Sequence, residues 1–553
     1  MMVLRSATLA LLGLLLVSPS VAEAQCGNPA TKSLVKGGGL HGANGLGIDP
    51  AGRLVVASVL GSELVTLKPQ NGQILGRLGF DMGVDGPDDL IFGPDGSVYW
   101  TSLFTGNIGR RTPDGTVSFQ FIAPGTNPIT FSADGRLFTA LDFLGDALYE
   151  LDPDLQAPPR LIAQNLGFMN GMDFGPDGRL YGPIWTQGRV VSIDPDSCTN
   201  AVDPWAECDI QEEATGFFAP AAVKFDSLGR LHVVDQKGEV TRINLATGAR
   251  QVLITMRPGL DNLVLDASNK LYVSSFSEGS VVEVRPNGTA RTLIGGAPVA
   301  PGGIAVLPGV HNPRVYVADL FTLRAYDGKT GALLDIADAI PAVPGLIAPQ
   351  SAAADGSNII LSSWFNNAVQ VWDPIAKVAV ETHYDVATPF GATRFQGDLV
   401  IAELNPGGGA RVARRTGGAW VTLATGFVLP VGLAASSDDL YVSDHALGCV
   451  FQVVNNNTTL AAPLPIACDL DTPEGLALDE NGKLLVVETG SGTLTRINPA
   501  TGAKSTVATG LETDLPAITN APPTYVASGV ATFGSAIYTA GDEGQRIYRT
   551  GNP

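Results

Sequence analysis

The sequence predicts an all-β protein built from two tandem six-bladed β-propellers, with about twelve four-stranded blades in all. Three observations predict this fold. An apolar strand, a turn rich in Gly or Asp and a second apolar strand recur about every forty residues along a chain of 553 residues. Within each repeat, apolar residues alternate or form short runs rich in Val, Leu, Ile and Tyr. Beyond the N-terminal segment, no stretch keeps a convincing helical period for more than about two turns.

The inner strands and their turns come first in each repeat. Asn44 begins NGLGIDPAGRLVVAS and Asp88 begins DDLIFGPDGSVYWTS, each a strand, a turn and a strand. The copies begin near Asn44, Asp88, Asn127, Asn170, Ala221, Asp261, Gly302, Gln350, Phe390, Val431, Glu474 and Ser528. Segments such as TRINLATGA and TRINPATGA, which are near duplicates, are typical of outer strands that end in turns. Units of this length suit propeller blades.

The number of repeats predicts two discs, because single propellers usually stop at about eight blades. The boundary is expected near residues 294–303, where GGAPVAPGG is typical of a short linker. We expect a signal peptide over residues 1–24, a first propeller over 25–297 and a second over 298–553. A single twelve-bladed ring is the alternative. Residues 25–40 are free to supply a closing strand for the last blade, and the sequence leaves open whether they do.

The N-terminus predicts export. Arg5 precedes the apolar run LALLGLLLV, and Ala22 and Ala24 are the small residues that a signal peptidase reads, so cleavage is expected before Gln25. A membrane anchor is the alternative, but the apolar run is too short to span a bilayer. No later segment is long and apolar enough for a membrane span. We therefore expect a secreted or periplasmic protein.

Charge and cysteine content agree with this class. A net charge of −20 would repel phosphate backbones and anionic lipid, which argues against a nucleic-acid partner. Five cysteines suit an oxidising compartment. Cys198 and Cys208 bracket a short insertion and are expected to form a disulfide, and Cys449 and Cys468 flank a loop and can form another. Cys26 is then left over, and connectivity stays open.

The repeats resemble a superfamily of six-bladed propellers that includes gluconolactonases, paraoxonases, strictosidine synthase and NHL-repeat proteins. The blade motif carries the resemblance, which covers nearly the whole mature chain. It is specific for the fold and weak for activity, because one fold hosts many functions.

The resemblance implies that the residue just before each innermost strand points into the central tunnel. In the first half of the chain these residues are Asn44, Asp88, Asn127, Asn170, Ala221 and Asp261, and five of the six are Asn or Asp. The second half has Gly302, Gln350, Phe390, Val431, Glu474 and Ser528 at these positions. Only the first half therefore presents a coherent ring of oxygen-bearing side chains.

A ring of carboxylate and amide oxygens without Cys or His indicates a site for a hard cation. Calcium accepts six to eight oxygens in loose geometry, which suits ligands from separate blades. The alternative is that these residues cap turns. PDDLIF and LDNLVLD resemble the acidic pair and the Asp-Asn pair of paraoxonases. By that resemblance Asp88, Asn127, Asn170 and Asp261 would be calcium ligands, with Asn262 and Asp89 in or beside the first shell. Together with the ring position Asn44, the predicted metal set is Asn44, Asp88, Asn127, Asn170, Asp261 and Asn262.

The predicted function is a secreted calcium-dependent hydrolase whose substrate is a small-molecule lactone or related ester. The cation would polarise a carbonyl oxygen, and Asp261 or Asp89 would take a proton from water. His41, three residues before Asn44, is a further catalytic candidate.

Two other functions remain as alternatives. One is a non-catalytic double-propeller binding protein with a structural calcium. The other is a metal-independent lyase or synthase of the strictosidine-synthase type, which would need a tunnel Glu that the first half lacks. Glu474 resembles the acidic position of gluconolactonases but stands almost alone in its ring. A protein partner of the second propeller is not identified.

Overall fold

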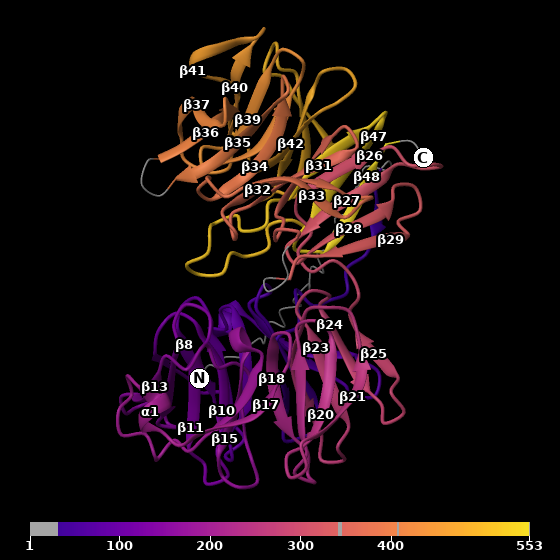
Figure 1. The fold of residues 1–553 in the computed structure, drawn as a ribbon. Helices are drawn as coiled ribbons and strands as arrows, with labels where there is room; N and C mark the ends of the chain where they lie inside the picture. The colour runs from indigo at the N-terminus through magenta and orange to yellow at the C-terminus, as the bar shows by residue number, and fades with distance from the viewer. Residues whose placement is uncertain (1–30, 341–344, 406–408, 552–553) are drawn as a thin grey trace, which may run out of the picture.

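Twelve four-stranded antiparallel sheets form nearly all of the regular structure in the computed structural model, which describes residues 31–340, 345–405 and 409–551. The sheets group into two lobes joined at a narrow waist (Figure 1). Strand β22 contacts β2 and closes the first ring of six sheets, and β46 contacts β26 and closes the second. The all-β fold and the two tandem six-bladed propellers are therefore confirmed.

The first propeller contains six sheets, each of which runs from an inner to an outer strand. The first two are β2 (Leu46–Ile48), β3 (Leu54–Ser58), β4 (Glu63–Leu67), β5 (Ile74–Leu78), and β6 (Pro87–Phe92), β7 (Val98–Ser102), β8 (Asn107–Arg111), β9 (Val117–Phe121). The next two are β10 (Thr126–Phe131), β11 (Leu137–Leu141), β12 (Ala147–Leu151), β13 (Arg160–Gln164), and β14 (Asp173–Phe174), β15 (Leu180–Ile184), β16 (Arg189–Ile193), β17 (Ile210–Thr215). The last two are β18 (Pro220–Phe225), β19 (Leu231–Asp235), β20 (Glu239–Asn244), β21 (Ala249–Thr255), and β22 (Leu260–Leu265), β23 (Leu271–Ser275), β24 (Ser280–Val284), β25 (Ala290–Ile294).

The second propeller follows the same order. Its first two sheets are β26 (Ile304–Leu307), β27 (Arg314–Asp319), β28 (Thr322–Asp327), β29 (Leu333–Asp338), and β30 (Ser351–Asp355), β31 (Asn358–Ser363), β32 (Ala368–Asp373), β33 (Val378–His383). The next two are β34 (Pro389–Phe395), β35 (Asp398–Asn405), β36 (Gly409–Thr416), β37 (Ala419–Phe427), and β38 (Pro430–Ala435), β39 (Leu440–Asp444), β40 (Cys449–Asn455), β41 (Thr458–Ala467). The last two are β42 (Pro473–Leu478), β43 (Leu484–Glu488), β44 (Thr493–Ile497), β45 (Lys504–Ala508), and β46 (Val530–Phe533), β47 (Ala536–Gly541), β48 (Arg546–Thr550), β1 (Thr31–Val35).

The N-terminal strand closes the last sheet. Strand β1 pairs antiparallel with β48, with Thr31 opposite Thr550 and Val35 opposite Ile547. Residues 31–35 therefore belong to the second propeller in space, although they precede the first in sequence. The expected division after residue 297 falls in the segment between β25 and β26.

The loops between strands contain short helices, and two disulfides lie in or beside them. The helices among the described residues are α1 (Pro204–Glu207) and the 3-10 turns η1 (Phe80–Met82) and η2 (Trp185–Gln187). Disulfides join Cys198 to Cys208, around α1, and Cys449 to Cys468, which confirms both expected pairings. The predicted signal peptide and Cys26 lie outside the described residues. None of the helices in the described ranges has the length and apolar character needed to cross a membrane.

The hydrophobic core lies between neighbouring sheets. Phe138 of β11 and Leu180 of β15, for example, are both fully buried in one cluster between the third and fourth sheets. Burial of such a side chain contributes roughly 1.5–3 kcal/mol. Because side chains from adjacent blades share clusters such as this one, packing between the blades holds the inner strands in place.

Candidate functional site

The two propellers face each other through equivalent loops. In the first propeller, the residue that follows the second strand of each blade lines a cavity at the waist; these residues are Val59, Leu103, Asp142, Trp185, Gln236 and Phe276. In the second propeller, Leu320 and Trp364 follow β27 and β31 and line the same cavity. The cavity has a volume of about 190 Å³. It therefore belongs to both propellers.

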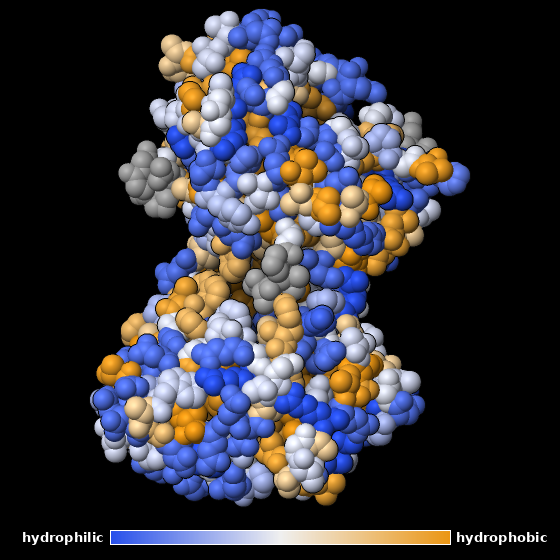
Figure 2. Space-filling model, in the orientation of Figure 1, coloured by the Kyte–Doolittle hydropathy of each residue, from blue (hydrophilic) through white to orange (hydrophobic). Residues whose placement is uncertain are grey.

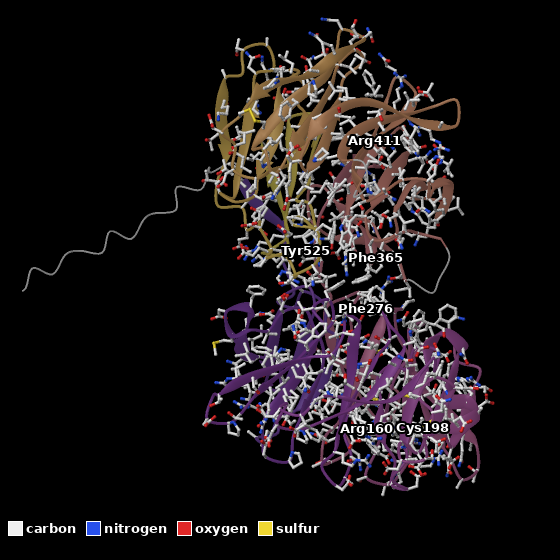
Figure 3. All side chains as sticks on the ribbon, turned by 90° about the vertical axis from the view of Figure 1, so that its left-hand side faces the viewer. Arg160, Cys198, Phe276, Phe365, Arg411 and Tyr525 are labelled. Atoms are coloured by element: carbon white, nitrogen blue, oxygen red, sulfur yellow. A yellow bond between two sulfur atoms is a disulfide. The ribbon has the colours of Figure 1, made fainter. Side chains whose placement is uncertain are left out.

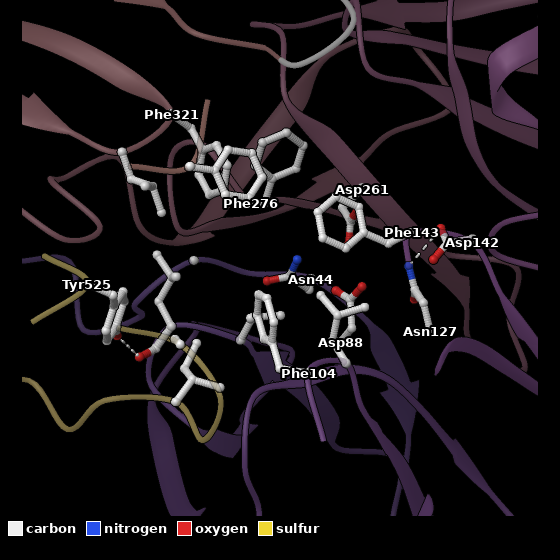
Figure 4. A pocket seen from close by; sticks show the side chains of 18 of the residues that line it. Asn44, Asp88, Phe104, Asn127, Asp142, Phe143, Asp261, Phe276, Phe321 and Tyr525 are labelled. Carbon is white, nitrogen blue, oxygen red and sulfur yellow. Dashed lines mark hydrogen bonds between the residues drawn. The ribbon is translucent and has the colours of Figure 1, made fainter. Parts of the chain in front are cut away.

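The mouth of the first tunnel forms the polar end of this cavity (Figure 4). Five of the six predicted ring positions line it, namely Asn44, Asp88, Asn127, Asn170 and Asp261. The structure thus brings together side chains from five blades that the sequence places far apart.

Local irregularities at the start of the inner strands aim these side chains. In β6 the pairing register with β7 shifts between Pro87 and Leu90, which leaves Asp88 and Asp89 outside the regular ladder. The same shift occurs in β10 around Asn127 and in β22 around Asp261. A bulge of this kind bends a strand and redirects a side chain. The first residue outside the regular ladder in each of these strands therefore reaches the cavity: Asp88, Asn127 and Asp261.

Asp142 is a further acidic residue at this site, and it was not predicted from the sequence. Its Oδ2 accepts a hydrogen bond from Nδ2 of Asn127 at 3.0 Å, and its backbone oxygen accepts one from Nε1 of Trp185 at 3.3 Å. Its Oδ1 is buried and has no hydrogen-bond partner among the residues that the structure describes. A signal for Asp142 is present in the sequence, because this residue directly follows the second strand of its repeat, one strand later than the ring position Asn127.

Three aspartates, Asp88, Asp142 and Asp261, share this site. Burial, followed by the charge of Asp89, raises the pKa of Asp88 to about 7, although Asn44 donates a hydrogen bond that opposes the shift. Burial, and then the charge of Asp88, raises the pKa of both Asp142 and Asp261 well above the ordinary value. Removing several carboxylates from water disfavours their charged forms. A bound cation would relieve this penalty.

The carboxylates alone do not complete a metal site. Over the described ranges, no three His, Cys, Asp or Glu side chains gather closely enough to hold a metal ion by themselves. Amide side chains lie among the carboxylates: Nδ2 of Asn127 donates to Oδ1 of Asn170 at 3.4 Å, and Asn44 donates to both Asp88 and Asp261. Their amide oxygens would have to complete the coordination of a metal. A mixed carboxylate and amide set suits calcium, which takes both kinds of oxygen.

Asp89 and Asn262, two of the predicted site residues, lie one layer deeper and outside the cavity. Nδ2 of Asn262 donates to Oδ1 of Asp89 at 3.0 Å, and the backbone N–H groups of Leu90 and Ile129 donate to the same carboxylate. Burial raises the pKa of Asp89. The pair ties the strands β6, β10 and β22 together beneath the ring.

His41 lies away from the ring. Its Nε2 is 3.1 Å from the backbone oxygens of Asp542 and Glu543 in the loop between β47 and β48, and burial lowers its pKa to about 4. The chain leaves β1 in the second propeller and crosses to the first, so His41 still contacts the loop after β47. It lines a separate groove with Glu63 and Arg77.

The remaining wall of the cavity is apolar and aromatic. Phe104, Phe143 and Phe276 come from the first propeller. Phe321, Trp364, Phe365 and Tyr525 come from the second. Figure 3 shows Phe276, Phe365 and Tyr525 gathered at the waist. The site therefore combines a floor of oxygens with an aromatic enclosure.

The second tunnel carries no comparable ring among the residues that the structure describes. Phe390 and Val431 are buried and pack with Leu429 and Ala527 across its mouth. Glu474 accepts a hydrogen bond from the backbone N–H of Ser528 at 2.7 Å and another from Thr524, so its carboxylate is used internally.

Comparisons with known proteins find distant structural matches. No protein-family model and no curated protein matches the sequence. Among solved structures, a virginiamycin B lyase from Staphylococcus aureus matches at 14% identity and a TM-score of 0.37, covering 52% of this chain and 95% of its own. A gluconolactonase from Xanthomonas campestris matches at 15% identity and 0.35, covering 44% and 86%. The extracellular domain of a one-component system from B. thetaiotaomicron matches at 10% and 0.31, covering 95% and 84%.

By its own sheet topology, the chain is a duplicated six-bladed β-propeller. Because the identities and TM-scores of these matches are low, function has to be argued from the site itself.

Proposed function

We propose that the chain is a secreted calcium-dependent hydrolase of lactones or related esters, acting at the mouth of the first propeller. The observation that carries the proposal is the buried Oδ1 of Asp142, which has no hydrogen-bond partner within residues 31–340, 345–405 and 409–551 and lies at one site with Asp88 and Asp261. Charged groups out of water are retained where a counter-charge meets them. The two disulfides support export, because such bonds persist in oxidising compartments.

Calcium fits this donor set better than magnesium does. The residues that would hold it are Asn44, Asp88, Asn127, Asn170 and Asp261, joined by Asp142. Ligands from separate blades give a loose shell, whereas magnesium demands a tight octahedron. Asn262 would act from below, by holding Asp89 and through it the strands that carry the ring.

A bound calcium ion would supply Lewis-acid polarisation of a substrate carbonyl oxygen. The protein's own groups would supply the base. Asp142 and Asp261 both line the cavity, and a carboxylate oxygen of this pair that does not contact the cation would accept a proton from water. A positioned base of this kind contributes about 100- to 10,000-fold to the rate. Asp89 lies outside the cavity with its oxygens bonded, so in this mechanism it supports the ring.

The test is hydrolysis of a panel of aryl esters and lactones, with calcium and after chelation. Turnover should need calcium and should fall at least about 100-fold in Asp261→Ala, while Asp134→Ala, an exposed turn residue in the third blade, should leave it unchanged. Hydrolysis that survives both chelation and Asp261→Ala would contradict the proposal. Stabilisation by calcium without any turnover would favour the non-catalytic binding protein.

A further inference from the structure

The cavity at the waist has two chemically different ends. The floor carries the oxygens of the ring, and the opposite wall carries aromatic rings from both propellers. Figure 2 shows hydrophobic residues on both sides of the hollow between the lobes, on the face that is visible there. A ligand that fills this space meets polar partners at one end only.

Direct contacts across the waist hold the aromatic wall together. Phe143 stacks on Phe365 with ring centroids 6.1 Å apart, and Phe276 meets Phe321 edge to face at 4.7 Å. Each pair joins one residue of the first propeller to one of the second. Such pairs contribute beyond the area that they bury, so they fix the two propellers relative to each other at this point.

The segment between β45 and β46 completes the wall and fastens it to the first propeller. The hydroxyl of Tyr525 donates to the backbone oxygen of Leu60 at 2.6 Å, and Nδ2 of Asn520 donates to the backbone oxygen of Phe104 at 3.3 Å. Nε1 of Trp364 donates to the backbone oxygen of Tyr525 at 2.7 Å. The polar atoms of Tyr525 and Trp364 are thus bonded within the protein, and their apolar ring surfaces are left for a ligand.

We propose that the second propeller is the specificity half of the site, and that the substrate is a compact aromatic or otherwise apolar ester or lactone whose reacting carbonyl alone reaches the oxygen ring. This inference rests on the proposed function. A cavity of about 190 Å³ is close in size to engineered apolar cavities of about 150 Å³ that bind benzene, so it takes one ring and a short acyl group. Phe321, Trp364 and Phe365 enclose that ring.

The same wall excludes polyhydroxylated sugar lactones. Their hydroxyl groups would lie against aromatic carbon and lose the hydrogen bonds that they make in water. Even one additional hydroxyl in a hydrophobic pocket is worth about 100-fold in discrimination. We therefore expect phenyl acetate to exceed δ-gluconolactone, a molecule of similar size, by more than about 100-fold in kcat/KM.

The experiment combines turnover with binding in the full-length, calcium-loaded protein. Acetanilide is an isostere of phenyl acetate with an amide in place of the ester, and its affinity is measured by titration calorimetry. Phe365→Ala should raise KM for phenyl acetate and weaken acetanilide binding by the same factor, about 10-fold or more, with kcat nearly unchanged. Phe365→Leu, which keeps most of the packing, should give a smaller loss. Phe533→Ala, at a partly exposed site at the end of β46, is the control.

The outcomes separate the two proposals. Acetanilide binding that Phe365→Ala weakens, without hydrolysis of any ester, would overturn the hydrolase and support the apolar site. Hydrolysis of δ-gluconolactone as fast as phenyl acetate, or a Phe365→Ala variant that folds and behaves as the wild type, would overturn the specificity role. Failure of acetanilide to bind would overturn it as well.

Discussion

Asp142 is the residue on which the chemistry of the site depends most. It follows β11 and lies beside the ring of entry residues. Its Oδ2 accepts a hydrogen bond from Asn127, whereas its Oδ1 has no hydrogen-bond partner among the described residues. Burial, and then the charge of Asp88, disfavours the ionised form of Asp142, and a bound cation would stabilise that form.

We predict that Asp142→Asn lowers calcium affinity by about 10- to 100-fold, because it removes one negative charge and replaces one oxygen with an NH₂ group. Titration calorimetry with calcium measures this. Asp134→Asn, an exposed residue in the same blade, is the matched control and should bind calcium as the wild type does. Equal affinity in both variants would remove Asp142 from the site.

A second buried acid, Asp542, makes the stability of the second propeller depend on pH. Burial, and then the charge of Glu474, raises its pKa from 3.8 to about 7. The folded protein therefore binds this proton more tightly than the unfolded chain does. The resulting stability is present below about pH 4 and is lost as the pH rises towards 7, with an amplitude on the order of 4 kcal/mol.

We predict that Glu474→Gln makes this loss shallower, since it removes the neighbouring charge that raises the pKa of Asp542. The measurement is the free energy of unfolding in urea at several pH values between 4 and 8. Glu480→Gln, at an exposed turn, should follow the wild-type curve. A Glu474→Gln curve parallel to the wild type would contradict the coupling.

At the residue scale, most of the residues that line the polar end of the cavity could be predicted from the sequence, although they come from separate blades. Five strand-leading positions reach the cavity as predicted, because an Asn or Asp at each inner strand is visible in the repeat. Asp89 and Asn262 follow such positions, and successive residues of an extended chain point in different directions. The position of His41 is set by the segment that runs from β1 in the second propeller to the first propeller. No local sequence pattern predicts the path of that segment.

Two kinds of element position the site: the irregular starts of the inner strands and the loops after the second strands. Repeat spacing predicted the strands well, since each blade has its own alternation and turn. It left the role of β1 open, because pairing of β1 with β48 joins residues 519 positions apart, as Thr31 and Thr550 show. Nothing in a local pattern reports such a contact.

We predict that Val35→Asp destabilises the second propeller by about 3 kcal/mol, because Val35 is buried against Ile304 and Ile547 and a carboxylate there has no counter-charge. Urea denaturation gives the cost, and limited proteolysis locates the loosened sheet. Lys32→Asp, on the exposed side of the same strand, is the control. If both variants were equally stable, β1 would not close the ring in solution.

At the scale of the whole molecule, the two propellers face each other across the cavity, and a buried ion pair between Arg324 and Asp319 helps to hold them together. Nε of Arg324 donates to Oδ2 of Asp319 at 2.6 Å, and its Nη2 donates to the backbone oxygen of Ser277 in the first propeller at 3.1 Å. The other oxygen of Asp319 accepts from the linker N–H groups of Val299 and Ala300. Burial still raises the pKa of Asp319.

We predict that Arg324→Ala costs about 3–5 kcal/mol, because it leaves the Asp319 carboxylate buried without its partner. The double variant Arg324→Met with Asp319→Leu should recover much of this stability, since neither charge then remains buried. Urea denaturation compares the two. A double variant as unstable as the single one would show that packing, and not the uncompensated charge, sets the cost.

The most direct measurement of the central claim is anomalous diffraction from crystals grown with calcium. We predict one strong calcium peak at the mouth of the first tunnel, within coordination distance of at least two of Asp88, Asp142 and Asp261 and of oxygens from Asn44, Asn127 or Asn170. Calcium peaks confined to the surface, with none inside the ring, would contradict a metal site there and with it the proposed chemistry.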